Sequence, residues 1–203
     1  MRLHNTSDTV RVRPRTQRRK GYVRTVAHIA LLRGINVGGN NKLPMEDLRA
    51  MFVRAGCGEV ATYIQSGNVV YEVRATRASK VATFVESAIR ERFGYRIPVV
   101  TRTAEELRGV AEENPFVAAR APLEELHVMF LADAPSASRL ASLDPNRSPH
   151  DRWAARTREL YLHLPNGVGQ SKLTNAYLDS TLGTVSTGRN WRTVLKLVEL
   201  SRR

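Results

Sequence analysis

Blocks of apolar residues separated by polar turns predict an alternation of strands and helices along the first half of the chain. Residues 26–32 form a continuous apolar run, which is typical of a central β-strand. The segment 44–55 has apolar positions at helical spacing and is followed by glycine, so we expect a helix there. Two runs rich in β-forming residues, 60–65 and 69–73, are separated by Ser-Gly-Asn at 66–68, a signal for a tight hairpin.

A second helix and a fourth strand complete one structural unit. Residues 81–89 carry apolar side chains at helical spacing, Gly94 ends that pattern, and 97–101 has the composition of a strand. The resulting order, β-α-β-β-α-β, is that of a ferredoxin-like domain. A right-handed crossover makes the first two strands point the same way, so the segments that follow them, 33–42 and 65–68, should lie together at one end of the sheet.

The same order of elements recurs in the second half, although the residues themselves show no visible repetition. After a helix at 104–113 and an irregular stretch at 114–122, the expected elements are a strand at 126–131, a helix at 136–143, a hairpin of 151–156 with 159–164, a helix at 171–178, a short strand at 184–187 and a last helix at 190–200. The last helix should bury Trp191, Val194, Leu195 and Val198.

The predicted fold class is therefore α+β, with two ferredoxin-like subdomains at 25–103 and 104–203, mixed or antiparallel sheets and a C-terminal helix. A chain of 203 residues, 42% of them apolar, can form such cores. Residues 1–24 differ, because they hold eight Lys or Arg, one Asp and almost no large apolar side chain. We expect a disordered basic extension there. It is either an arm for nucleic acid or an extension without function, produced by a start codon placed too far upstream.

Charge and cysteine content limit the kinds of binding partner and the cellular compartment that we expect. Lys and Arg number 32 against 19 Asp and Glu, a formal net charge of +13 that favours anionic partners. Cys57 is the single cysteine, so no intrachain disulfide can form, and we expect a small buried or half-buried thiol. No apolar run approaches the roughly 18 residues that span a bilayer, and no signal-peptide region is visible, so we expect a cytoplasmic protein without membrane contact. The five histidines show no close pairing, and we expect no metal and no cofactor.

The segment 33–42, with the sequence RGINVGGNNK, is longer and more polar than an ordinary connection between a strand and a helix. Gly34 and Gly39 have the spacing of a nucleotide P-loop, but Asn40 stands in place of the lysine and Asn41 in place of the magnesium-binding hydroxyl. The predicted hairpin also conflicts with the parallel sheets of P-loop proteins. A weaker prediction is an anion held by converging backbone amides near a helix N-terminus. The alternative is a structural loop whose Asn and Gly residues supply positive φ angles.

The predicted meeting of these two loops makes their polar residues a candidate ligand-binding site. Arginine would hold the oxygen atoms of an anion bidentately, and Asn and Gln amides would fix its orientation. Cationic positions at the expected starts of two later helices would contribute from the second subdomain. The complete candidate set is Arg33, Asn36, Gly38, Gly39, Lys42, Gln65, Ser66, Asn68, Lys172, Arg189 and Asn190. The sequence assigns no catalytic residue.

Four motifs resemble those of a known family. They are LRGINVGG at 32–39, TYIQSGNVV at 62–70, SKLTN at 171–175 and TGRNWRTV at 187–194, and they are similar to those of the bacterial domain of unknown function family 1697 (DUF1697). The resemblance covers about residues 26–200. It implies two ferredoxin-like α+β subdomains in one cytoplasmic protein, and it supplies no activity, cofactor or catalytic residue. The basic extension departs from the family pattern, which starts close to the first strand.

These observations predict a protein that binds a phosphate-bearing small ligand at the loop after the first strand. Two alternatives stay open: a nucleic-acid-binding protein, with contacts mainly through residues 1–24, or an enzyme acting on a phosphorylated metabolite. The RNA-recognition module shares this element order, but its third strand carries stacking aromatics, whereas residues 69–73 contain one aromatic and one acid. This argues against that module and not against contacts with a phosphate backbone.

Overall fold

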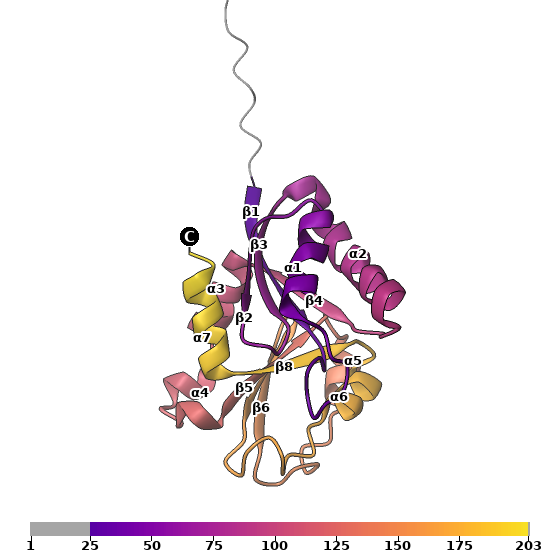
Figure 1. Ribbon diagram of the computed structural model, residues 1–203. Coiled ribbons are helices and arrows are strands. Elements are labelled where there is room, and N and C mark those ends of the chain that lie inside the picture. The colour runs from indigo at the N-terminus through magenta and orange to yellow at the C-terminus, as the bar shows by residue number, and fades with distance from the viewer. Residues whose placement is uncertain (1–24, 203) are drawn as a thin grey trace, which may run out of the picture.

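The computed structural model describes residues 25–202 and contains the predicted succession of strands and helices (Figure 1). The first half consists of β1 (Thr25–Leu32), α1 (Met45–Arg54), β2 (Gly58–Tyr63), β3 (Asn68–Arg74), α2 (Ala75–Phe93) and β4 (Val99–Thr103). The second half consists of α3 (Ala104–Glu112), α4 (Pro115–Ala118), the 3-10 helix η1 (Leu123–Glu125), β5 (Leu126–Leu131), α5 (Ala137–Ala141), β6 (Arg152–Arg156), β7 (Glu159–His163), α6 (Asn175–Leu182), β8 (Ser186–Asn190) and α7 (Trp191–Leu200). The basic extension predicted at 1–24 lies outside the described residues.

Each half is built on one four-stranded sheet. The strand order is β2-β3-β1-β4 in the first sheet and β6-β7-β5-β8 in the second, and every pair of neighbouring strands is antiparallel. The protein therefore has the predicted α+β fold of two ferredoxin-like subdomains, with antiparallel rather than mixed sheets. The second sheet repeats the order of the first although the two sequences share little.

The helix predicted at 171–178 begins later, because the chain at its start forms a turn. The Ser171 hydroxyl accepts a backbone N–H two residues further on, at 3.1 Å. The Thr174 hydroxyl then caps the observed helix α6, which starts at Asn175. The prediction that Lys172 stands at a helix start was therefore wrong.

The boundary between β8 and α7 also differs from the prediction. β8 continues to Asn190, because all its residues pair with β5, so Arg189 belongs to a strand. Asn190 caps α7. On α7 the buried stripe includes Leu197, whereas Leu195 is 41% exposed, contrary to the prediction. The stretch expected to be irregular, 114–122, contains the short helix α4, which Asn114 caps.

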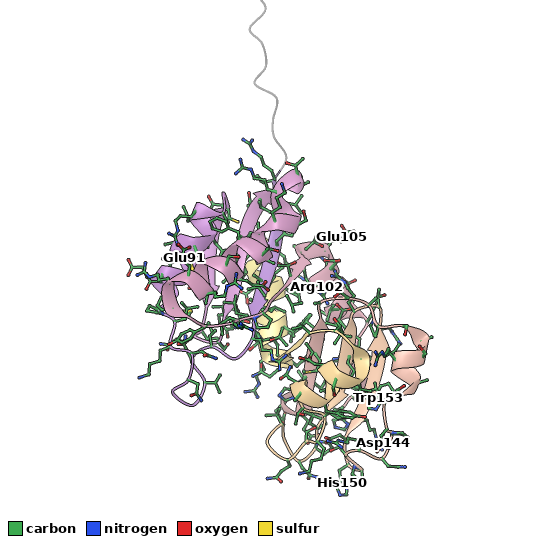
Figure 2. The ribbon with its side chains drawn as sticks, turned by 90° about the vertical axis from the view of Figure 1, so that its right-hand side faces the viewer. Glu91, Arg102, Glu105, Asp144, His150 and Trp153 are labelled. Atoms are coloured by element: carbon green, nitrogen blue, oxygen red, sulfur yellow. The ribbon has the colours of Figure 1, made fainter. Side chains whose placement is uncertain are left out.

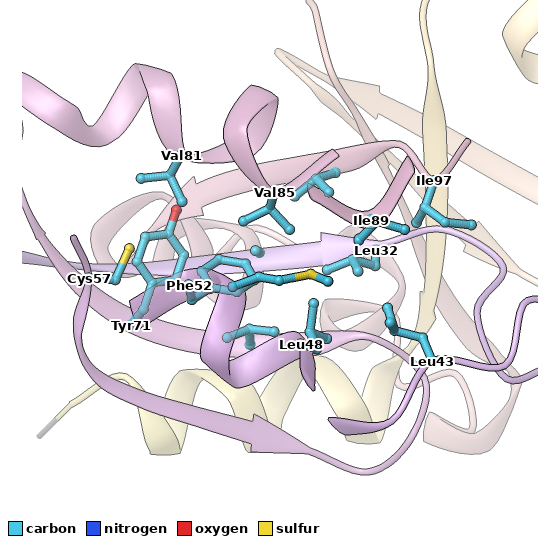
Figure 3. Close-up of a cluster of buried hydrophobic side chains, with 14 of the residues drawn as sticks. Leu32, Leu43, Leu48, Phe52, Cys57, Tyr71, Val81, Val85, Ile89 and Ile97 are labelled. Atoms are coloured by element: carbon cyan, nitrogen blue, oxygen red, sulfur yellow. The ribbon is translucent and has the colours of Figure 1, made fainter. Parts of the chain in front are cut away.

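Two clusters of buried side chains lie under the outer helices. One fills the space between the first sheet and α1 and α2, where the rings of Phe52 and Tyr71 have centroids 5.0 Å apart (Figure 3). Cys57 belongs to this cluster, and burial raises the pKa of its thiol to about 11, which confirms the expected buried thiol. A second cluster lies between the second sheet and α5 and α6.

A central cluster joins the two halves. It combines Ile29 and Leu31 of β1 with Val128 and Phe130 of β5, and it includes apolar side chains of α3 and α7. These two helices contact each other, and Figure 1 shows them on the same side of the molecule. Since β1 and β5 are buried on both faces, the subdomains pack against each other through a shared core.

Candidate functional site

The loop after β1 and the hairpin after β2 are in contact, as the handedness of the crossover predicted. The amide nitrogen of Asn36 donates to the carbonyl oxygens of Leu43 and Gln65, at 3.0 and 2.9 Å. The backbone N–H of Leu32 donates to the carbonyl oxygen of Gly67 at 2.8 Å. The two segments therefore form one surface at the end of the first sheet.

Asparagine side chains of the loop hold its shape. The Oδ1 atom of Asn36 accepts the backbone N–H of Leu43 at 2.8 Å, so both ends of this amide have protein partners. Asn36 and Asn41 adopt positive φ angles of 55° and 47°, and the Asn41 amide donates to the carbonyl oxygen of Gly34. This geometry supports the structural interpretation of these asparagines.

The side chain of Arg189 crosses from the second subdomain into the first. It is buried, and within the part of the chain that the structure describes its five N–H groups donate to neutral acceptors only. These acceptors are Oδ1 of Asn68, the hydroxyl of Thr187 and the carbonyl oxygens of Leu32, Ser66, Gly67 and Gly188. Burial lowers the pKa of the guanidinium to about 10, so it still carries its charge at pH 7.

Arg102 occupies the equivalent position in the first subdomain and lies where the two halves meet (Figure 2). Each arginine is the fourth of five residues in the last strand of its sheet, β4 or β8, and is followed by the N-cap of a helix. Arg102 donates to the carbonyl oxygen of Leu131, the last residue of β5, as Arg189 does to Leu32 at the end of β1. Both also donate to the carbonyl oxygen just before the third strand of the other half. We call these reciprocal contacts the first joint (around Arg102) and the second joint (around Arg189).

The two joints differ in charge at two equivalent positions. The first residue of the third strand is Glu159 in the first joint, where it accepts from the arginine Nε at 2.7 Å, and Asn68 in the second. The third residue of the next helix is Glu106 in the first joint, where it pairs with Arg158 at 2.5 Å, and Thr193 in the second. Both carboxylates of the first joint are thus replaced by neutral side chains in the second.

A hollow of about 670 Å³ opens between the subdomains beside Arg189. We call it the junction hollow, and its volume lies in the range of small-molecule sites, about 300–1,000 Å³. From the first subdomain it is lined by Arg33, Gly34, Ile35, Val37, Ile64 and Ser66. From the second it is lined by His127, Met129, Leu162, Leu164, Val168, Ser171, Leu173, Thr174, Asn175, Thr187, Gly188, Arg189, Asn190 and Thr193.

Among residues 25–202, the charges around the junction hollow leave one net positive charge. Arg33 and Asp179 form an ion pair across the subdomains, so together they are neutral. Burial lowers the pKa of His127, partly offset by the nearby backbone of Glu125, so this imidazole adds no charge at pH 7. Arg189 remains, and the N-terminus of α7 adds a partial positive charge beside it.

The structure distributes the predicted site residues over different places. Those that line the junction hollow are Arg33, Ser66, Arg189 and Asn190. Those that line a separate hollow of about 490 Å³, beside the start of α1, are Asn36, Gly39, Lys42 and Gln65. Lys172 lines a third hollow of about 500 Å³, Asn68 is buried, and Gly38 lines none of these three.

Sequence reasoning missed several residues of the site, above all Arg102, Asp179 and His127. A weak signal was present, because β1 and β5 both contain a histidine four residues before their last leucine. A second signal is an arginine followed by a helix-capping residue, at 102–103 and again at 189–190. Together these positions mark the internal correspondence between the halves.

Two kinds of feature are absent from residues 25–202. In that part of the chain, no group of three or more His, Cys, Asp or Glu side chains comes together to hold a metal ion. Within the same range, none of the helices has the length and apolar composition required to cross a membrane.

The comparison with known protein families identifies the family of this chain. The profile of the family described as "Protein of unknown function (DUF1697)" matches residues 26–161. The chain belongs to this family. The resemblance carried by the motifs is therefore confirmed.

Among solved structures, this DUF1697 chain is similar to conserved bacterial protein SP0830 from Streptococcus pneumoniae. The TM-score is 0.67 at 20% sequence identity, and the match covers 88% of this chain and 99% of the other. At that identity the likeness establishes the shared fold alone. A comparison with curated proteins finds no match.

Proposed function

We propose that this DUF1697 protein is a cytoplasmic protein that binds a small anionic ligand, with a phosphate or carboxylate head group, in the junction hollow. The observation that carries the proposal is the buried charge of Arg189, which has only neutral acceptors among residues 25–202 and lies beside a hollow of ligand size. Buried charges in proteins are normally paired, because an unpaired buried charge costs free energy. A bound anion would provide the missing charge.

The first joint supports this interpretation by contrast. There, the carboxylates of Glu159 and Glu106 balance the buried Arg102 and its neighbouring cation. In the second joint Asn68 and Thr193 stand at those positions, and Thr193 lines the open hollow. An anionic head group near Thr193 would restore the balance that the first joint has from its own side chains.

Direct contacts would come from side chains other than Arg189, whose five N–H groups are occupied. Among the described residues, the Arg33 side chain pairs with Asp179 alone and through one nitrogen, so it keeps N–H groups for a ligand. The hydroxyls of Ser66 and Thr174 also line the hollow. Arg189 would act through its field, which is strong where water is excluded.

The test is an isothermal titration of the full-length protein with inorganic phosphate, phenyl phosphate and octanoate. We expect at least one of them to bind, and Arg33→Gln to weaken that binding by about tenfold or more, since the substitution leaves Asp179 to cancel the charge of Arg189. The ion pair is partly exposed, so the variant should lose less than about 1 kcal/mol of folding stability.

Lys172→Gln is the matched control, because it removes one positive charge from a different hollow. Its binding should equal that of the unchanged protein. Equal weakening by both substitutions would mean that net charge alone attracts the anion. Absence of binding by all three probes would overturn the proposal.

A nucleic-acid-binding protein is the second candidate, favoured by the net charge of +13. Residues 1–24 carry much of that charge, so deleting them tests this candidate directly. If the shortened protein still binds single-stranded RNA with steep salt dependence, the folded part is the binder. An enzyme acting on the bound anion would show itself as turnover during the titration.

A further inference from the structure

The floor of the junction hollow is apolar. Met129, Leu162, Leu164 and Leu173 line it, and each is also part of the core cluster beneath α5 and α6. Each of them is at most 6% exposed, so the floor that they form is a narrow apolar surface. The lining also holds polar side chains, among them those of Arg189 in β8 and of Asn190 and Thr193 at the start of α7. The lining thus combines one buried cation and several polar groups with apolar side chains.

The rim of the hollow is apolar as well. Val37 in the loop after β1 is 61% exposed, Ile64 in the hairpin after β2 is 53% exposed, and Val168 in the segment before α6 is 66% exposed. Val168 and Val37 are the two most exposed large apolar side chains among the described residues. Three separate segments, from both subdomains, therefore present apolar side chains to the same opening. Such clustering of exposed apolar surface marks binding sites more often than scattered exposed residues do.

The charge of the junction hollow suits an anion with a single charge, which loses less hydration on binding than a multiply charged one. Counted over the described residues, the net charge of the hollow is +1, because the Arg33–Asp179 pair is neutral and His127 is uncharged at pH 7. Arg189 has no N–H group left to replace the water lost by a multiply charged head group. A nucleoside triphosphate would lose much hydration and recover little of it here.

We propose that the ligand of the junction hollow is an amphipathic organic anion with one negative charge, such as a carboxylate or phosphodiester head on a hydrocarbon body. The head would lie beside Arg189 and Arg33, and the body would cover the apolar floor and pass between the apolar side chains of the rim. This inference rests on the proposed function and narrows it from any small anion to one chemical class.

A matched set of probes tests the inference by isothermal titration of the full-length protein. Octanoate has both the charge and the hydrocarbon, acetate has the charge alone, and 1-octanol has the hydrocarbon alone. We expect octanoate to bind at least about tenfold more tightly than either of the others, since each buried methylene adds to the affinity and the charge meets Arg189. Inorganic phosphate should bind more weakly than octanoate.

Two variants test whether the hydrocarbon body of the ligand contacts the rim of the junction hollow. The double substitution Val37→Ser, Val168→Ser removes apolar surface from the rim at exposed positions, so folding should be retained. We expect it to weaken octanoate binding by about threefold or more and to leave acetate unchanged. Val53→Ser is the matched control, because Val53 is 56% exposed on α1 and does not line the hollow.

The outcomes separate this inference from the proposed function. If acetate or inorganic phosphate binds as tightly as octanoate and depends on Arg33, the anion site stands and the amphipathic ligand is excluded. If 1-octanol binds as tightly as octanoate, the hollow is an apolar site and the role of the charge is overturned. If no anion binds, both proposals fall.

Discussion

The two joints between the subdomains share one architecture and differ in chemistry. In each, an arginine near the end of the last strand reaches across to the end of the first strand and the start of the third strand of the other half. The first joint holds Arg102 and Arg158 against the carboxylates of Glu159 and Glu106. The second joint surrounds its arginine with amide, hydroxyl and carbonyl groups.

Because of this difference, the charges of the first joint balance each other, whereas the charge of the second joint has no balancing carboxylate among its described neighbours. The first joint is neutral on its own, so we infer that its role is to hold the subdomains together. The second joint makes the same crossing contacts but carries an extra positive charge beside a hollow. Under the proposed function, equivalent positions in the two ferredoxin-like halves would serve a structural purpose on one side and a binding purpose on the other.

The largest effect should come from removing the arginine of the first joint. Arg102→Met leaves the side chain of Glu159, 10% exposed, as a buried carboxylate without its ion pair. Breaking such a pair costs about 3–5 kcal/mol of folding stability. Arg189→Met is the matched substitution in the second joint, and it should cost less than Arg102→Met, because it leaves only neutral acceptors unsatisfied and no buried charge.

Urea denaturation of the full-length protein, followed by tryptophan fluorescence, measures both free energies of unfolding. A larger loss for Arg189→Met than for Arg102→Met would show that the difference in charge between the joints does not control their stability.

An intermediate loss of folding stability is expected when the carboxylate of Glu159 in the first joint is replaced by an amide, the group that Asn68 supplies in the second joint. Glu159→Gln keeps an acceptor for Arg102 but loses the charge, and its amide nitrogen would face the backbone N–H of Arg158, which the carboxylate now accepts at 3.1 Å. The free energy of unfolding should fall by about 2 kcal/mol, the range of a hydrogen bond to a charged group. Circular dichroism in urea measures it. A change below about 0.5 kcal/mol would mean that Arg102 needs no carboxylate partner.

The fold could be predicted because its signals are local. Apolar runs, Ser-Gly-Asn at 66–68 and the glycine after α2 each act within a few residues, and they placed most elements correctly. The prediction was wrong where tertiary pairing decides a boundary. β8 continues through Arg189 because β5 provides its hydrogen-bond partners, and α6 starts late because Ser171 folds its own turn.

The candidate site could be predicted only in part, because its decisive contacts are distant in the sequence. The meeting of the loop after β1 with the hairpin after β2 followed from chain handedness. By contrast, Arg189 donates to Leu32, 157 residues away, and to Asn68, 121 residues away. Composition identifies Arg189 as a cation, but only the packed structure shows that its N–H groups are occupied and that no carboxylate of the described residues pairs with it.

A smaller change in stability, with a clear change in binding, is expected when the second joint is given a carboxylate. In Asn68→Asp the new carboxylate would pair with Arg189, but it would also face the carbonyl oxygen of Tyr63, to which the amide nitrogen now donates at 3.1 Å. These two effects oppose each other, so stability should change by less than about 1 kcal/mol. The hollow would lose its net charge, and octanoate binding should weaken by about tenfold. Unchanged octanoate affinity in a folded Asn68→Asp protein would exclude Arg189 as the source of attraction.

The smallest effect concerns the histidines at equivalent positions of β1 and β5. His28 lies against Tyr71, with ring centroids 5.6 Å apart, and its Nδ1 is 2.9 Å from the carbonyl oxygen of Val26, whereas His127 lines the junction hollow. Burial lowers the pKa of His127 below its usual 6.5, so at pH values below about 6.5 the unfolded chain binds more protons at this position than the folded one. The free energy of unfolding should therefore fall as the pH is lowered from 7 to 5, and part of that fall should disappear in His127→Gln. Urea titrations of both proteins at the two pH values give the difference, in which the contributions of other acidic groups cancel. If the two proteins lose equal stability, the pKa of His127 is the same in the folded and the unfolded state. In that case water in the junction hollow solvates this imidazole.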